Sequence, residues 1–413
     1  MNPVPHSPAD RRTCRKKAFR RAALIALCGL VAGAVGVTLG LPALGLVLAL
    51  AGFLLAWRAL RKPGGVPILV YHSVSPDAGW LPWARNISVR PEVLDIHLRT
   101  LRRDGWNIVS TEDLVAARAN GASLPPQAVV LQFDDAYLDN YLFAAPILRR
   151  HNAPATIFAS VDFVEPGEVP RGADRSCGPE AWQGYMNVAE LRHLDGDPLF
   201  AVEAHGTNHA RIPVSDRTSG LVGPDWKRHA PLTWATDPEN KSRWFEAVTP
   251  PPSLRPDASL PETDSALAGR WWRDGSAEDE AAFRARVSQM LSQAYRELAA
   301  LLDRAPRVMA WPFDRFDPVS VDAAQEAGFV AVTGGRQDNR REDHVPGNGP
   351  VILSRVHLQD RAFGGGPLWL EALALRARVN TAAGWLVWHP VTALANRLRR
   401  RRLGPSGYDR VAS

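Results

Sequence analysis

The stretch of residues 128–137, with the sequence AVVLQFDDAY, constrains the fold of this chain more than any other. Its first six residues are apolar apart from one glutamine, which is typical of a buried strand. That strand ends in two adjacent carboxylates, Asp134 and Asp135, which no hydrophobic core accepts unpaired. We therefore expect both acids at the carboxyl end of a strand, facing a cleft. Two carboxylates so close together need a cation or a shared proton.

A second predicted strand, residues 199–204 (LFAVEA), leads directly into the sequence HGTNH. Its two histidines, His205 and His209, are four residues apart, so both imidazoles can face one side of a turn and bind one ion. Together with Asp135 they predict a three-ligand metal site with one open coordination position. The alternatives are a solvated or packed helix face for the histidines and a helix cap for the acids. The metal site is favoured because each pair follows its own strand, where α/β enzymes place their sites.

Four motifs together resemble one known family, the NodB-type polysaccharide deacetylases (carbohydrate esterase family four). Residues 132–136 (QFDDA) resemble its Thr-Phe-Asp-Asp-Gly signature, and residues 205–209 resemble its His-Ser/Thr-x-x-His motif. Residues 310–314 (AWPFD) are similar to its aromatic-Pro-aromatic wall. Residues 66–72 (VPILVYH) look like the opening strand of the branch that acts on surface polysaccharides. The resemblance extends over about residues 66–375, and the motifs occur in family order.

The resemblance implies a role for each matching residue. It assigns Asp134 as the general base and Asp135, His205 and His209 as the metal ligands. The implied pocket wall consists of Trp311, Pro312 and Phe313. Zinc is the favoured divalent ion for two histidines and one aspartate. Such an ion polarises an acyl carbonyl and activates water, while the unligated carboxylate takes the proton. The implied reaction is hydrolysis of an N-acyl group from an amino sugar.

The two ligand motifs each depart from the family pattern at one position, and His72 is a further candidate site residue. Ala136 replaces the glycine of the signature and would be strained if the turn there requires a positive φ. Gly206 stands where serine or threonine is usual, which removes a hydroxyl but no ligand. His72 ends the first predicted core strand, where we expect it to hydrogen-bond substrate or water. Its alternative role is purely structural.

The late motif of the family is altered at residues 352–357 (ILSRVH). Arg355 occupies the place of the general-acid histidine, and His357 lies two positions further on. Residues two apart on a strand share a face, so either side chain can reach the site. We predict His357 as the acid and Arg355 as a partner that orients Asp134. A structural salt bridge is the alternative for Arg355.

The charge of the chain is unevenly distributed. Residues 1–62 carry ten Lys or Arg against one acidic residue, and residues 397–413 carry six against one. Because the whole chain is +6, the remaining body has a net charge of about −8. This distribution argues against a nucleic-acid surface and for basic segments placed beside anionic lipid.

Residues 22–57 run for 36 positions without a charged side chain. One membrane pass needs roughly 20 residues, and residues 40–42 (GLP) are a turn signal. Two short passes, about 22–39 and 43–57, are favoured over one tilted helix, and a cleavable signal peptide is the alternative. Both flanks are basic, so the positive-inside rule favours both in the cytoplasm. A hairpin would keep the enzyme cytoplasmic and a single pass would export it, so the face of the bacterial inner membrane is left open.

From residue 66 onward, predicted strands and helices alternate, which indicates a parallel sheet in a closed or nearly closed barrel. The family resemblance implies an α/β fold with an incomplete (β/α) barrel. Residues 1–62 are then a basic head with a membrane anchor, and residues 63–376 form the catalytic domain. Residues 377–413 form a tail with tryptophans and arginines, predicted either to contact the membrane interface or to be solvated.

Residues 210–276 interrupt the alternation with a cluster of prolines and tryptophans. We predict a loop-rich insertion, and tryptophans suit stacking on sugar rings in a lid over the cleft. A packed surface insertion or an interfacial patch is the alternative.

The favoured function is metal-dependent N-deacetylation of an amino-sugar polysaccharide, with the glycan and membrane lipid as partners and no nucleic acid. One alternative is deacylation of a lipid-linked or nucleotide-linked sugar at the cytoplasmic face. Another is a glycan-binding protein in which the altered motifs have abolished catalysis.

Overall fold

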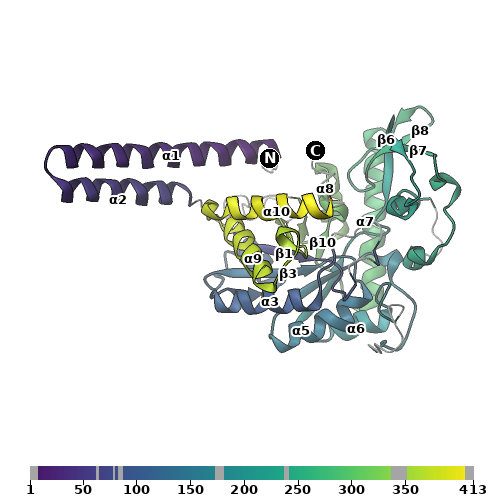
Figure 1. Ribbon diagram of the computed structural model, residues 1–413. Helices are drawn as coiled ribbons and strands as arrows, with labels where there is room; N and C mark the ends of the chain where they lie inside the picture. The colour runs from purple at the N-terminus through teal and green to yellow at the C-terminus, as the bar shows by residue number, and fades with distance from the viewer. Residues whose placement is uncertain are drawn as a thin grey trace.

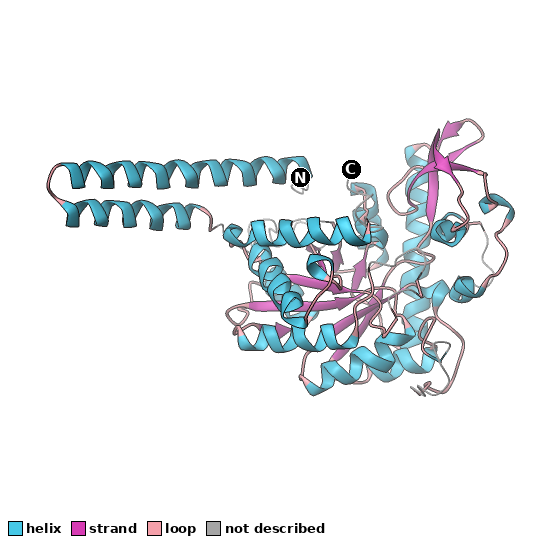
Figure 2. Ribbon diagram, in the orientation of Figure 1, coloured by secondary structure: helices cyan, strands magenta, loops and turns pink. Residues whose placement is uncertain are grey.

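The computed structural model describes residues 8–61, 65–77, 80–81, 87–172, 181–236, 241–335 and 351–404. It has three parts in space (Figure 1): two long antiparallel helices that project to one side, a central α/β body, and a strand-containing insertion on the opposite side of that body. The strands of the body lie among helices (Figure 2).

Nine short strands form one sheet at the centre of the body, and every pairing within it is parallel. Adjacent strands follow this order: β12 (Val351–Leu353), β11 (Ala331–Thr333), β10 (Val308–Ala310), β5 (Phe200–Ala204), β4 (Ala155–Ala159), β3 (Ala128–Phe133), β1 (Ile68–Tyr71) and β13 (Val356–His357), with β2 (Asn107–Val109) paired to β3. The run of apolar residues at 128–133 is therefore a central strand, buried along its whole length.

The two ends of this sheet come from consecutive pieces of chain. β12 pairs with β11 and β13 pairs with β1, yet only Ser354 and Arg355 separate β12 from β13. The sheet therefore closes into a ring of seven strand positions, the last of which is shared by β12 and β13. A complete (β/α) barrel has eight, so the prediction of an incomplete (β/α) barrel is confirmed.

The interior of the ring is filled by alternate residues of its strands. They form one apolar cluster together with Leu114 and Val115 of α4 (Thr111–Asn120), which closes the end where the strands begin. Strand members of the cluster include Ile68, Val70, Val130, Phe158, Ala310, Ala331 and Leu353.

The inward-facing rows continue past the carboxyl ends of the strands. A residue two positions beyond an inward one faces the same way. Extending the rows that contain Val70, Gln132, Glu203 and Leu353 by one step gives the side chains at the mouth of the ring: His72, Asp134, His205 and Arg355. The local strand pattern thus brings together residues that are far apart in the sequence.

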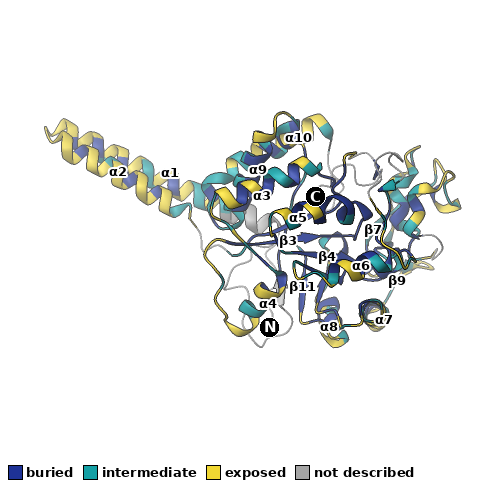
Figure 3. Cartoon of the chain, turned by 90° about the horizontal axis from the view of Figure 1, so that it is seen from below, coloured by how far each residue is buried: buried dark blue, intermediate teal, exposed yellow. Residues whose placement is uncertain are grey.

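Helices surround the ring, and burial is concentrated at the strands (Figure 3). These helices are α3 (Pro91–Arg103), α5 (Ala145–Arg150), α6 (Val188–Asp195), α7 (Glu280–Leu302), α8 (Pro318–Ala327), α9 (Leu368–Ala382) and α10 (His389–Leu403). Side-chain caps begin several of them: Asn187 accepts from the Glu190 backbone N–H and Asp279 accepts from that of Ala282. A π-helical segment, Asn140–Ala144, directly precedes α5.

The insertion is more regular than the sequence indicated. β6 (Arg211–Leu221) and β7 (Ser259–Ser265) form an antiparallel pair with two register shifts, and β8 (Trp272–Arg273) pairs with β9 (Ser276–Ala277). The prediction of a loop-rich segment is wrong for these strands. Their residues are mostly polar and only partly buried, so they lack the apolar alternation by which strands are recognised.

The N-terminal segment forms two helices, α1 (Pro8–Thr38) and α2 (Pro42–Ala59). By length and composition, Arg15–Thr38 and Pro42–Ala59 are long and apolar enough to cross a membrane. The turn falls at residues 39–41, so the predicted break into two helices agrees with the structure. Insertion into a membrane, the domain boundaries and the interfacial role of the tail stay predictions.

The interior packing of the ring predicts a large effect of truncating Phe158, which has no exposed surface. Phe158→Ala should lower the free energy of unfolding by about 3–5 kcal/mol, because it leaves a cavity that the closed ring cannot fill. Chemical denaturation of the full chain in detergent measures this. Val169→Ala, at a position that is 73% exposed, is the control and should change stability by less than about 0.5 kcal/mol. Equal effects would contradict the placement of Phe158.

Candidate active site

The candidate site lies at the mouth of the ring, in the segments that follow β3 and β5. Asp134 and Asp135 follow β3, His205 follows β5, and His209 precedes β6. Asp135 and Ala136 both have left-handed backbone, with φ of 74° and 50°. The turn therefore does require a positive φ at Ala136, and the alanine there is strained as the sequence predicts.

Asp135, His205 and His209 form a buried cluster whose ligand atoms all lie within 4.8 Å of one another. The Nε2 atoms of both histidines are 3.4 Å from Oδ1 of Asp135. His205 donates from Nδ1 to the carbonyl of Ala310 at 2.9 Å, which leaves Nε2 free to act as a ligand. Oδ2 of Asp135 is buried and accepts no hydrogen bond within the described residues. Two imidazoles and one carboxylate with a spare oxygen fit a divalent metal ion.

The electrostatics of this cluster also suit a cation. Burial disfavours the charged form of Asp135, but His209 and His205 outweigh it and hold the pKa of Asp135 well below its ordinary value. Burial lowers the pKa of His209 to about 4, so its imidazole is neutral at pH 7 and offers a lone pair. For His205, burial opposes protonation, but Asp134 and Asp135 outweigh it and raise the pKa. The cluster thus attracts positive charge beside Asp135.

A second group of charges adjoins the first and is centred on Arg355. Its Nη1 donates to Oδ1 of Asp134 at 2.7 Å, and its Nη2 donates to Oδ1 of Asp314 at 2.6 Å. The imidazole of His357 bonds the other oxygen of Asp314. His72 lies 3.8 Å from Oδ2 of Asp134 and stacks on His357 with ring centroids 5.5 Å apart. The structure therefore brings Asp134, Arg355, His357 and His72 together, as the sequence predicts.

Burial and charge shift the pKa values of this second group in opposite directions. Burial alone would lower the pKa of Arg355, but Asp134 and Asp314 raise it further above its ordinary value. Burial would raise the pKa of Asp314, but His357 and Arg355 hold it well below the ordinary range. Burial lowers the pKa of His72 to about 4, despite the carboxylates of Asp134 and Asp135 nearby. At neutral pH this histidine is therefore uncharged.

Asp314 is the residue of this group that sequence reasoning missed. It ends the motif AWPFD, in which only the aromatic and proline residues were given a role. Its signal was a carboxylate placed just after a predicted strand, as in Asp134 and Asp135. Phe313 and Asp314 have φ of 61° and 56°, and this left-handed pair accompanies the turn of the carboxylate toward Arg355.

The predicted pocket wall is only partly placed at the site. Phe313 packs edge-on against His209, with ring centroids 4.4 Å apart. Pro312 lies close to Gly206, whose φ of 73° explains why a residue without a side chain occupies that position. Trp311 has no exposed surface and stacks on Phe316, so its contact with a substrate stays a prediction that its packing does not support.

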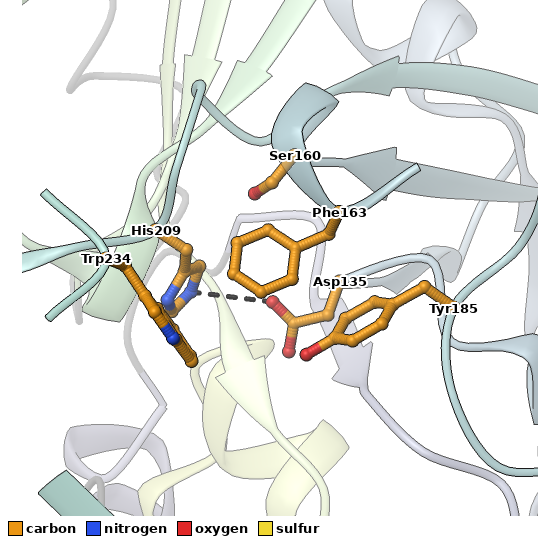
Figure 4. A pocket seen from close by; sticks show the side chains of 6 residues that line it. All are labelled: Asp135, Ser160, Phe163, Tyr185, His209 and Trp234. Atoms are coloured by element: carbon orange, nitrogen blue, oxygen red, sulfur yellow. Dashed lines mark ion pairs between the residues drawn. The ribbon is translucent and has the colours of Figure 1, made fainter. Parts of the chain in front are cut away.

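A small pocket beside the metal cluster is lined by Asp135, Ser160, Phe163, Tyr185, His209 and Trp234 (Figure 4). Trp234 comes from the insertion and packs edge-on against Phe163, with centroids 4.9 Å apart. Trp244 of the insertion donates to the hydroxyl of Tyr185 at 2.9 Å. Of the tryptophans in the insertion, these two are buried next to the cluster. The insertion thus covers one side of the candidate site.

Curated proteins match parts of the sequence, whereas no model of a protein family matches it. Over 176 residues the chain is 35% identical to the poly-β-1,6-N-acetyl-D-glucosamine N-deacetylase of Escherichia coli K12. This match covers 37% of this chain and 26% of the Escherichia coli protein. Over 103 residues the chain is 29% identical to YxkH of Bacillus subtilis, a polysaccharide deacetylase by name. This match covers 25% of this chain and 34% of YxkH. The chain thus spans about a third or less of these curated relatives.

Solved structures of deacetylases also resemble the chain. The de-N-acetylase from Aggregatibacter actinomycetemcomitans has a TM-score of 0.49 at 20% identity and covers 71% of this chain and 94% of that one. IcaB from Ammonifex degensii has a TM-score of 0.48 at 15% identity and covers 79% and 98%.

The sequence matches and the motifs point to the same family. Asp135 of the signature and both histidines of the His-x-x-x-His motif form one buried cluster at the mouth of an incomplete barrel, and the relatives that match by sequence are deacetylases by name. In its motifs, its fold and its sequence matches the chain resembles the NodB-type polysaccharide deacetylases, carbohydrate esterase family four.

Proposed function

We propose that this protein is a metal-dependent N-deacetylase of an amino-sugar glycan. The observation that carries the proposal is the contrast between two adjacent carboxylates at one strand end. Asp135 lies in the three-residue cluster with His205 and His209, whereas Asp134 is turned to Arg355 and stays outside it. Such a pair separates a ligand from a base.

The proposed ion is zinc, held by Asp135, His205 and His209. When bound, it would supply a Lewis acid that polarises the acyl carbonyl and makes water a stronger nucleophile at neutral pH. The neutral imidazole of His209 and the Nδ1 bond of His205 prepare both histidines for that role.

Asp134 is proposed as the general base that removes a proton from water as it attacks the acyl carbon. Its contact with Arg355 engages Oδ1 and fixes the direction of the carboxylate, so Oδ2 remains for the proton. Arg355 is a positioning residue in this proposal, because it acts through Asp134. His72, 3.8 Å from Oδ2, would hydrogen-bond the substrate or the water on that side.

His357 is proposed as the general acid that protonates the departing sugar amine. Asp314 binds its Nε2 atom and so orients the imidazole. An amine leaves an amide only when protonated, so the reaction needs an acid at this position. The pair of His357 and Asp314 supports this role.

The substrate is proposed as an N-acetylated amino-sugar oligomer or polymer. The curated Escherichia coli relative is by name a deacetylase of poly-β-1,6-N-acetyl-D-glucosamine. Phe163, Tyr185 and Trp234 line a small pocket beside Asp135 and His209, and we propose that the acyl group of the substrate enters on this side. The tryptophans of the insertion would then exclude water from one side of the reacting amide.

Removing a ligand should remove the metal. Asp135→Ala and His209→Ala are expected to lower zinc content to background and to abolish acetate release from an N-acetylglucosamine oligomer, because two ligands hold the ion poorly. Mass spectrometry of the purified protein gives zinc content. His193→Ala, which changes a histidine on the far side of α6, is the matched control and should retain both. A ligand variant with full zinc occupancy would contradict the proposed cluster.

Removing the base should leave the metal in place. Asp134→Asn keeps the shape and one acceptor for Arg355 but cannot take a proton. We expect wild-type zinc content and a fall in kcat of about 10²–10⁴-fold, measured by acetate release. Hydrolysis at the wild-type rate would show that Asp134 is not the base.

The role of His357 can be separated from that of Asp134 by the leaving group. His357→Gln should slow release of an amine by about 10²–10⁴-fold, since an amine must be protonated to leave. It should have far less effect on 4-nitrophenyl acetate, whose phenolate leaves without an acid. Asp134→Asn should slow both substrates. Equal losses on amide and ester in His357→Gln would exclude the acid role.

A further inference from the structure

The two N-terminal helices have unusual surfaces for a helical hairpin in water. Glycines line the contact between them: a Cβ added to Gly29 would come within 2.6 Å of the Gly52 Cα atom, and one added to Gly36 would come within 2.8 Å of the Gly45 Cα atom. Large apolar side chains point outward instead, and each is at least 50% exposed: Leu24, Leu27, Leu30, Val31, Leu46, Phe53 and Leu54. Small residues inside and large apolar residues outside are typical of helices packed in lipid.

The lengths of the helices match a bilayer. At 1.5 Å per residue, the uncharged part of α1, residues 22–38, and the 18 residues of Pro42–Ala59 span about 26 and 27 Å. The hydrocarbon core of a bilayer is about 30 Å thick. The turn at residues 39–41 contains no charged side chain, so it can pass through that core during insertion.

All charges of the hairpin gather at its open end. Arg20 and Arg21 precede the apolar part of α1, and Arg58 and Arg61 follow that of α2. The head of α1 also lies near the body, since the charge of Arg15 adds to the lowering of the pKa of His389 by burial. By the positive-inside rule, an open end with charges on both arms stays in the cytoplasm.

The open end is fixed to the barrel by specific contacts. Trp57 of α2 lies against Trp385, with ring centroids 6.4 Å apart, and Arg61 lies over the same indole at 4.5 Å. The Leu386 backbone N–H donates to the carbonyl of Leu60 at 3.0 Å. Two tryptophans and an arginine at the end of an apolar hairpin suit the interface between lipid and water.

These contacts lie at the end of the ring opposite the candidate site. α3 starts beyond the carboxyl end of β1 and runs back to Arg103, and the following Asp104 pairs with Arg376 of α9. α9 continues past this pair toward Trp385, so Trp385 lies where the strands begin. The metal cluster lies where they end, and the 13 residues of α3 separate the two levels by about 20 Å. In Figure 1 the hairpin and the insertion accordingly project from opposite sides of the body.

We propose that α1 and α2 cross the cytoplasmic membrane together as a hairpin, and that the beginnings of the barrel strands face the bilayer while the metal cluster opens away from it. The outer faces of both helices contact lipid tails, and the basic open end contacts anionic headgroups. The head of α1 and the barrel are both cytoplasmic.

This orientation limits the substrate, a consequence that rests on the proposed deacetylase function. A sugar attached directly to a membrane lipid lies at the headgroups, about 20 Å short of the metal cluster. The acyl sugar must therefore reach the site through water on the cytoplasmic side, either free or carried by a soluble group or by a chain long enough to span that distance.

Cysteine accessibility tests which side each part occupies. Cys14, Cys28 and Cys177 are replaced by serine in the full chain, and one cysteine is returned by Leu39→Cys in the turn or Val248→Cys in the insertion, positions that are 70% and 90% exposed. In intact spheroplasts, a membrane-impermeant maleimide should label Leu39→Cys at once and Val248→Cys only after permeabilisation. Labelling of Val248→Cys in intact spheroplasts, or none of Leu39→Cys, would overturn the hairpin.

Energy transfer to acceptor-labelled lipid headgroups tests which end of the barrel faces the bilayer. Asn120→Cys, exposed at the end of α4, is the matched position where the strands begin. A donor there should transfer more energy than one at Val248→Cys, in the same reconstituted chain. Equal transfer or the reverse order would overturn the orientation. Both tests are independent of catalysis, so a chain that releases no acetate still decides them.

Discussion

The site depends on which positively charged groups balance the negative charges of three buried carboxylates. Asp134, Asp135 and Asp314 all lie at the mouth of the ring with side chains at most 7% exposed, and Arg355 is the one guanidinium that contacts any of them in the described structure. Removing a partner from a buried charge costs about 3–5 kcal/mol. Because Arg355 serves Asp134 and Asp314, Asp135 is left with imidazoles alone. A divalent cation at Asp135 would therefore supply charge that the protein itself does not provide.

Much of this arrangement could be predicted from sequence because strands leave a strong local signal. The apolar run before Asp134 and the short strand before His205 both end in residues that cannot be buried alone. The family resemblance, with its motifs in the same order, predicted that these residues belong to one site. The placement of Arg355 beside Asp134 followed from the alternation of a strand. These inferences needed only local patterns and one resemblance.

Features that depend on long-range pairing were not accessible in the same way. β12 and β13 are too short to show a periodic pattern in the sequence. β12 pairs with β11 and β13 pairs with β1 because the ring closes at this point. The polar strands β6 and β7 stabilise each other without an apolar face of their own. The role of Asp314 depends on a left-handed turn at Phe313 and Asp314, which residue types alone do not indicate. Similar strain at Ala136, held in place by the strands around it, would cost about 1–2 kcal/mol.

The last position of the ring is shared by β12 and β13, and this arrangement links the order of synthesis to the completion of the site. Arg355 lies in the short link between β12 and β13, so it reaches Asp134 only when Leu69 near the start of the barrel has paired with Val356 near its end. Contacts between such distant parts of a chain form slowly, because a long loop must close first. A growing chain on the ribosome therefore carries its metal ligands well before it has Arg355 or His357. Full reactivity would arrive only with the last strand, after α1 and α2 have long since emerged.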